Sequence, residues 1–173
     1  MKNTLIVFIV GSFVFLSITA GARAQTSSSR VGFAFRQHNP DSTLESVTFG
    51  DDLSYMLAYE WEEQQAFWQI AVDYAPEIDT TNSVNSIITP QLNLLFKDKG
   101  WLGGIGVLSS LIEEDSGEDD WSDAYYQLII GFSLPVFGLK FNISAYYQFD
   151  SFSDIESFEE DNIDYAVWFK YAL

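Results

Sequence analysis

Apolar and polar residues alternate along most of the chain, and the regularity is clearest in the segment from Asp161 to Leu173. Every second residue from Ile163 onward is apolar, whereas the intervening positions carry charged residues, alanines and one tryptophan. Side chains on a β-strand point to opposite faces at a period of two, so the segment predicts a strand with one wholly apolar face. That face consists of Ile163, Tyr165, Val167, Phe169, Tyr171 and Leu173.

The same alternation recurs along the chain and predicts seven further strands. Most are about ten residues long, the length that a strand tilted near 45° needs to cross a bilayer. Pro90 lacks a backbone donor for the ladder and predicts a local irregularity, and Gly103, Gly104 and Gly106 predict a bend in a strongly curved sheet. The seven strands are expected at Val31–Gln37, Asp51–Trp61, Gln65–Ala75, Ile87–Lys97, Trp101–Ile112, Trp121–Leu134 and Leu139–Asp150.

The connections between the predicted strands alternate in length. Glu62–Gln64, Asp98–Gly100 and Pro135–Gly138 are short, and the connections between them are longer. Outer-membrane barrels have short periplasmic turns and long extracellular loops, and the aromatic residues near both strand ends suit the two bilayer interfaces. The pattern therefore predicts an all-β fold, an eight-stranded antiparallel up-and-down transmembrane β-barrel with short periplasmic turns and long acidic outer loops.

The N-terminal residues have the pattern of a secretory signal peptide. Lys2 precedes an apolar run, Leu5–Leu16, which is shorter than the roughly 20 residues of a membrane-spanning helix. The small-x-small sequence Ala22-Arg23-Ala24 predicts cleavage after Ala24, with an uncleaved membrane anchor as the alternative. A Sec-type signal with a barrel predicts the outer membrane of a Gram-negative bacterium. The expected divisions are a cleaved signal peptide at 1–24, a flexible lead-in at 25–30 and the β-barrel domain at 31–173.

Composition excludes several classes of function. The 173 residues leave little room for a second domain, and 25 acidic against 8 basic residues give a formal net charge of −17. A nucleic-acid partner would need a basic surface, so we expect none. The hydrophobic content of 47% and the aromatic content of 17% argue against a disordered acidic tail. Without cysteine, the chain has no disulfide framework and no cysteine metal site.

The composition of the polar strand faces separates two kinds of barrel. A soluble barrel of the lipocalin type also alternates, but its apolar face points inward to bind an apolar ligand, and its exterior should be rich in charged residues. Here the polar faces hold mostly small and amide residues with few charges. Such residues suit the narrow interior of an eight-stranded barrel, so we expect the apolar faces to contact lipid. A periplasmic lipocalin-like binder is the alternative.

Six charged residues on the polar strand faces are expected to point into the barrel. Paired and hydrogen-bonded, they would plug the interior, whereas unpaired buried charges are costly. We expect them to seal and rigidify the barrel, and a gated ion path is the alternative. The predicted inward cations are Arg36, Lys140 and Lys170, and the predicted inward acids are Glu60, Asp73 and Asp164.

Over Val31–Leu173 this architecture resembles the small eight-stranded outer-membrane proteins, the class of the OmpA transmembrane domain and OmpX. The resemblance lies in strand number, strand length and loop alternation rather than in a shared motif. It implies a monomer whose partners are outer-membrane lipid, lipopolysaccharide and the barrel-assembly machinery. The last strand is similar to the C-terminal signal read by that machinery, although the family signal usually ends in Phe or Trp. The signal would comprise Tyr165, Val167, Phe169, Tyr171 and Leu173.

The resemblance also raises an enzymatic alternative, because lipid A acyltransferases and deacylases occur on eight-stranded barrels and use a histidine with a serine. His38 is the one histidine and lies next to a proline-containing turn. Ser42, Ser109 and Ser110 are candidate partners, but no spacing singles one out. We therefore expect His38 to be an ordinary loop residue, and we expect no catalysis and no cofactor.

Glu113–Asp120 and Asp150–Asp161 are expected to be acidic outer loops. Carboxylates suit hard cations such as calcium, yet neither segment has the spacing of a calcium loop. A solvated, flexible rim is the main expectation, and weak bridging of divalent cations to lipopolysaccharide is the alternative. The sequence thus predicts a structural or surface-interaction role through these loops.

Overall fold

The structure is a computed structural model of the chain. The predicted signal peptide lies outside the residues that it describes, as do residues 25–27 and large parts of the predicted outer loops. Among the described residues, no helix is long and apolar enough to cross a membrane. The described residues are 28–39, 43–44, 47–48, 53–63, 66–76, 84–114, 119–152 and 163–173.

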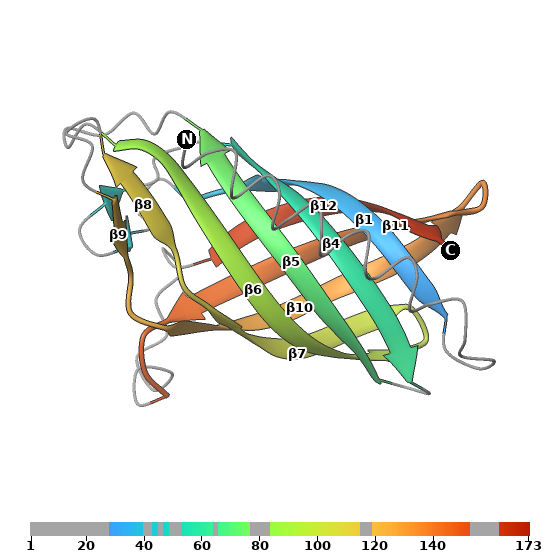
Figure 1. Cartoon of the computed structure of the whole chain (residues 1–173). Coiled ribbons are helices and arrows are strands. Elements are labelled where there is room, and N and C mark those ends of the chain that lie inside the picture. Colours follow the sequence, from blue (N-terminus) through green and yellow to red (C-terminus); the bar gives the residue numbers. More distant parts are fainter. Residues whose placement is uncertain are drawn as a thin grey trace.

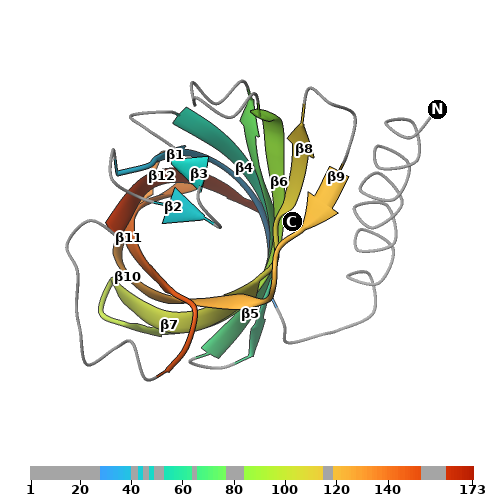
Figure 2. The same ribbon diagram turned by 90° about the vertical axis from the view of Figure 1, so that its left-hand side faces the viewer.

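The main strands form one closed antiparallel barrel (Figure 1). The strands of the ring are β1 (Ser29–Gln37), β4 (Leu53–Glu63), β5 (Ala66–Pro76), β6 (Val84–Asp98), β7 (Trp101–Leu108), β10 (Tyr125–Val136), β11 (Leu139–Phe149) and β12 (Ile163–Ala172). Each pairs with its neighbours in chain order, and β1 pairs with β12 to close the ring, which Figure 2 shows from one end. β2 (Thr43–Leu44) and β3 (Val47–Thr48) form a separate two-stranded sheet. The predicted eight-stranded up-and-down barrel is confirmed.

Two further strands extend the barrel wall at the end opposite the short turns. β8 (Leu111–Glu114) pairs with the first part of β6 and with β9 (Asp119–Trp121), and Figure 2 shows both strands turned away from the ring. The prediction of a loop over Glu113–Asp120 is therefore wrong at both edges, because Glu113 pairs with Asp119 in the β8–β9 ladder. The ladder can extend because β6 is 15 residues long and offers an edge beyond the ring.

The irregularity expected at Pro90 lies on one side of β6 only. Towards β5 the ladder runs through without a shift, with Pro90 opposite Val72. On its other side β6 pairs with β7 from Gln91 onward and with β8 up to Ile88, so its partner strand is interrupted between these two positions. The predicted strand Trp101–Ile112 is thus divided into β7 and β8, and the break lies opposite Pro90, which has no backbone N–H to donate.

Two short turns have the backbone that tight hairpins require. Lys99 and Gly100 have φ values of 46° and 93°, and Phe137 and Gly138 have φ values of 50° and 85°. Positive φ at both central residues is the geometry of a type I′ turn, whose twist matches that of the flanking strands. Both turns lie at the right-hand end of the barrel in Figure 1, away from β8 and β9. At these two hairpins the predicted short connections are confirmed.

The apolar strand faces point outward and the polar faces point into the barrel. On β12, Tyr165 and Phe169 expose 57% and 43% of their surface, whereas Arg36 on β1 and Lys170 on β12 expose 1% and 3%. A lipocalin-like barrel needs the opposite arrangement, with its apolar face enclosed, so the structure contradicts that alternative. The interior is narrow enough that a Cβ at Gly106 would collide with the side chain of Asn93.

Candidate functional site

The polar interior of the barrel is the candidate functional site, because it gathers the buried charged and amide side chains of the described residues. Three clusters follow one another along the barrel, from the end that carries β8 and β9 to the end with the short turns. The outer cluster is Arg36, His38, Ser54, Asp73 and Asp164; the amide cluster is Gln69, Gln91, Asn93 and Gln127; and the basic cluster is Arg30, Lys97, Lys99, Lys140 and Lys170.

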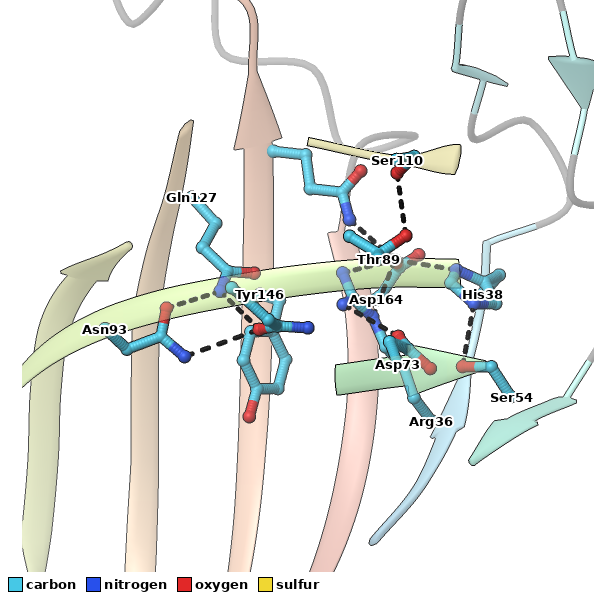
Figure 3. A network of polar contacts seen from close by, with 12 residues as sticks. Arg36, His38, Ser54, Asp73, Thr89, Asn93, Ser110, Gln127, Tyr146 and Asp164 are labelled. Carbon is cyan, nitrogen blue, oxygen red and sulfur yellow. Dashed lines mark hydrogen bonds and ion pairs between the residues drawn. The ribbon is translucent and has the colours of Figure 1, made fainter. Parts of the chain in front are cut away.

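Arg36 on β1 holds the outer cluster together (Figure 3). Its Nη1 lies 3.2 Å from Asp73 Oδ2 on β5, and its Nη2 lies 2.8 Å from Asp164 Oδ2 on β12. The guanidinium carbon lies 4.8 Å from the ring centroid of Tyr146 on β11. Each of the three charged side chains exposes 5% of its surface or less. These three charges must be paired with one another, because a single unpaired charge in such an interior costs several kcal/mol.

His38 belongs to the outer cluster, so the prediction of an ordinary loop residue is wrong. Its ring is buried, with Nδ1 2.9 Å from Asp164 Oδ2 and Nε2 3.0 Å from Ser54 Oγ. Ser54 is not one of the predicted serine partners. The sequence does not identify Ser54 as the partner of His38, because spacing along the chain does not give the register between β1 and β4. That register places Ser54 directly opposite Arg36. The sequence does indicate that Ser54 points into the barrel, because it shares the inward face of its strand with Met56.

The predicted serines make other contacts. Ser110 Oγ lies 2.7 and 2.8 Å from two buried hydroxyl groups, on β6 and β10. Ser109 Oγ donates to a backbone carbonyl at 3.1 Å. Ser42 lies outside the described residues. These contacts occupy Ser109 and Ser110, and the serine hydrogen-bonded to His38 is Ser54.

Ser54, His38 and Asp164 are hydrogen-bonded in the order of a Ser–His–Asp catalytic triad. A nucleophile must also be reached by its substrate, and Ser54 is fully buried. The cavity beside His38 has a volume of about 10 Å³, the space of roughly one water molecule, and Ser54 does not line it. Asp164 Oδ2 is also shared with Arg36. In this arrangement the three residues satisfy one another's polar groups and leave no room for an acyl chain.

Four amide side chains form a continuous hydrogen-bonded cluster across the middle of the barrel. Figure 3 labels two of them, Asn93 and Gln127. Gln127 Nε2 donates to Asn93 Oδ1 at 2.8 Å and to Gln91 Oε1 at 2.9 Å. Asn93 Nδ2 donates to Gln69 Oε1 at 2.8 Å, and Gln69 Nε2 donates to Glu60 Oε1 at the same distance. The alternation of the sequence places all four amides on the inward face, but their partners depend on strand register. The amide cluster separates the outer cluster from the basic cluster.

Two large aromatic side chains fill the interior beside the amides. Trp168 Nε1 donates to Tyr146 Oη at 2.8 Å, and both side chains are buried. Lys170 Nζ lies 4.8 Å from the ring centroid of Trp168, so a cation rests against an aromatic face. The middle of the barrel is therefore packed with side chains, as expected for an eight-stranded barrel.

The basic cluster surrounds the short-turn end of the interior. Lys170 Nζ lies 2.5 Å from Glu60 Oε1, and Arg30 Nη2 lies 2.5 Å from Glu62 Oε2. Lys97 also pairs with Glu62. Two carboxylates thus serve three cations at this end of the barrel.

The six charges expected in the interior are divided between the two ends. The outer end brings together Arg36, Asp73 and Asp164, and the short-turn end brings together Glu60 and Lys170. Lys140 is half-buried at the short-turn end, and no carboxylate of the described residues pairs with it. Arg30 is a further interior cation, because β1 begins at Ser29, two residues before the expected start of the barrel domain.

The residues of the predicted assembly signal lie on the outer face of β12. Tyr165, Phe169 and Tyr171 expose 57%, 43% and 58% of their surface, and Leu173 beyond the strand exposes 60%. Val167 lies between them on the same face of the strand. The outward direction leaves these side chains accessible to another molecule, and their role in assembly stays a prediction.

Metal binding by the acidic loops also stays a prediction. Within the part of the chain that the structure describes, no group of three or more histidine, aspartate or glutamate side chains is placed to hold a metal ion. Residues 115–118 and 153–162, which include half of the first acidic segment and most of the second, lie outside that part.

No protein-family model matches the sequence, and no curated protein does. Among solved structures, the chain is similar to Neisserial surface protein A (NspA), with 10% sequence identity, a TM-score of 0.50 and coverage of 84% of this chain and 96% of that one. Two structures of Ail, the attachment invasion locus protein of Yersinia pestis, have TM-scores of 0.39 and 0.38, too low to support an argument. They share 13% and 14% identity over 84% of this chain and 95% of theirs, and the second is a complex with the heparin analogue sucrose octasulfate. The similarity to NspA concerns the fold alone, and by that fold this chain has the architecture of the small eight-stranded outer-membrane β-barrels.

Proposed function

We propose that the protein is a small outer-membrane β-barrel with a structural or surface-interaction role and no catalytic activity. The observation that carries the proposal is the polarity of the barrel, with aromatic and aliphatic side chains outside and paired charges and amides inside. Ile130 in the middle of β10 exposes 61% of its surface, whereas Gln127 on the same strand and Asp164 on β12 are fully buried. Lipid favours such a barrel, because closure satisfies the backbone hydrogen bonds of every strand.

The proposed orientation places the short turns in the periplasm and the β8–β9 hairpin outside the cell. Asp119, Asp120 and Trp121 are exposed on that hairpin, which extends the wall beyond the ring. Together with the acidic loops it would present carboxylates to the medium, where divalent cations could bridge them to anionic lipopolysaccharide. This surface is the part of the molecule best suited to contact other molecules outside the cell.

We also propose that residues 1–24 direct export by a Sec-type pathway and that the barrel inserts as a monomer. The outward apolar residues of β12, among them Tyr165 and Phe169, would then be read by the barrel-assembly machinery. Their exposure on the last strand of the ring supports this role.

A lipid-modifying enzyme is the second candidate, and one observation favours it, the hydrogen-bonded series Ser54, His38 and Asp164. Three features of this series argue against catalysis. The hydroxyl is fully buried, it points into the barrel rather than toward lipid, and its neighbouring carboxylate is engaged by Arg36. We therefore assign the series to the packing of the interior.

Cell fractionation with and without detergent tests the membrane proposal. We expect the protein in the membrane pellet, released by detergent and not by salt, with unheated and boiled samples migrating differently on a gel. A matched periplasmic protein should stay in the supernatant throughout. Recovery of this protein in the detergent-free soluble fraction would overturn the proposal.

A further inference from the structure

The short-turn end of the barrel contains a cavity of about 320 Å³. All eight strands of the ring contribute to its walls, and the turn that follows β6 forms part of its rim. The volume lies at the lower end of the range for small-molecule sites. The cavity is therefore large enough for a small solute.

Cations are concentrated around this cavity. The sequence holds six basic residues beyond position 24, and five of them, the whole basic cluster, line the cavity. Glu60 and Asp98 are the two carboxylates that line it, so five positive charges against two negative ones leave a local net charge of +3 in a chain of net charge −17. Charges of one sign around a recess with low-dielectric walls focus the field and concentrate ions of opposite charge.

Internal ion pairs do not neutralise the basic cluster. Glu60 and Glu62 serve three of its members, and among the described residues no carboxylate pairs with Lys140 or Lys99. The β11–β12 register places Lys140 directly opposite Lys170 on the neighbouring strand. Like charges in directly opposed positions destabilise a sheet, so an anion lying between them would relieve a repulsion that the fold itself creates.

We propose that this cavity binds a small soluble molecule that carries phosphate groups. Lysine ammonium groups bind phosphate oxygens as point charges, and an arginine adds a planar set of donors. Ser133 lines the same cavity, and its hydroxyl group adds a neutral donor beside Lys140 and Lys170. A multivalent phosphate would lie between these two lysines. Binding does not depend on the role of the outer loops or on the direction in which the barrel is inserted.

Calorimetric titration of the refolded, detergent-solubilised full chain with pyrophosphate tests the proposal. We expect saturable one-to-one binding whose affinity falls as sodium chloride is added, because salt screens exposed charges. Lys140→Gln should weaken binding about tenfold, the effect of losing one charge-assisted contact. Asp98→Asn should strengthen it, because this substitution removes an exposed carboxylate from the rim.

The matched control is Asp150→Asn, which removes one exposed carboxylate at the opposite end of β11 and should leave the affinity unchanged. Heat-dependent gel migration identifies the variants that have folded. The proposal is overturned if the wild-type chain binds no pyrophosphate, or if Lys140→Gln and Asp98→Asn both bind it as the wild type does. Binding of dihexanoyl phosphatidic acid without binding of pyrophosphate would assign the cavity to a lipid headgroup and would equally overturn the proposal.

Discussion

Arg36 on β1 and Asp164 on β12 form a buried ion pair, with Nη2 2.8 Å from Oδ2, at the seam where the first and last strands of the ring meet. The two residues are 128 positions apart in the sequence. Bringing such distant segments together costs chain entropy, which the β1–β12 ladder must offset. The two charges can therefore pair only when the barrel has closed, so closure and the burial of these charges are coupled.

Replacing Arg36 by Met should destabilise the barrel strongly. Asp73 and Asp164 would be left in the interior without their cation, and breaking a buried pair in this way costs about 3–5 kcal/mol. The free energy of unfolding, measured by reversible denaturant titration in lipid vesicles, should fall by that amount.

The companion variant removes all three charges through Arg36→Met, Asp73→Asn and Asp164→Asn. It should be more stable than Arg36→Met alone, because no unpaired charge remains in the interior. If Arg36→Met alone is as stable as the wild type, the pairing contributes nothing to the stability of the barrel.

Gly106→Ala should destabilise the barrel by about 1–3 kcal/mol, the usual range for an overpacked interior. A Cβ at this position would collide with the side chains of Asn93 and Gln127, which belong to the amide cluster. Gly103 is the matched control, since the nearest atom to its added Cβ is the Ile129 carbonyl oxygen at 3.9 Å. Gly103→Ala should unfold at the same denaturant concentration as the wild type, and equal losses in both variants would contradict the interior packing.

A charge on the outer face tests whether that face contacts lipid. Ile130 is exposed in the middle of β10, and a lysine at the midplane of a bilayer costs about 2–4 kcal/mol. Ile130→Lys should therefore lower the free energy of unfolding in vesicles by that amount. Trp121→Lys, on the exposed β9 strand beyond the ring, should have little effect. An Ile130→Lys variant that is as stable as the wild type would mean that this face lies in water.

Lipid A from cells that express the protein should have the same mass as lipid A from cells without it. Ser54→Ala should leave that mass unchanged and should cost about 1 kcal/mol of stability through the lost hydrogen bond to His38. Mass spectrometry of extracted lipid A and a denaturant titration measure the two effects. A mass change that appears with the wild type and disappears with Ser54→Ala would establish catalysis and exclude the purely structural role.

The inward direction of the interior charges could be predicted from sequence because a strand alternates at a period of two. That rule assigns Arg36, Glu60 and Asp164 to the polar face without any knowledge of their neighbours. It also predicts the strands and the short turns, since polar and turn-forming residues interrupt the alternation at regular intervals. The rule does not depend on contacts between distant segments, which is why it succeeds.

Alternation failed where the wall no longer encloses an interior. β8 and β9 carry Glu113 and Asp119 beyond the ring, where both faces of a strand can be polar. Without an apolar face the pattern does not distinguish a strand from a loop, so the hairpin was predicted as part of an acidic loop. Its strands form because the long β6 supplies hydrogen-bonding partners at its edge.

By itself, the sequence determined the barrel, the inward or outward face of the side chains on the strands of the ring, and the excess of acid over base. Only the tertiary structure decided which side chains meet: His38 with Ser54, Arg36 with two carboxylates, and Lys140 opposite Lys170. The physical reason is that alternation defines a side chain's direction within its own strand, whereas its partners depend on the register between strands. A shift of register would leave the composition of every face unchanged and would replace these contacts with others.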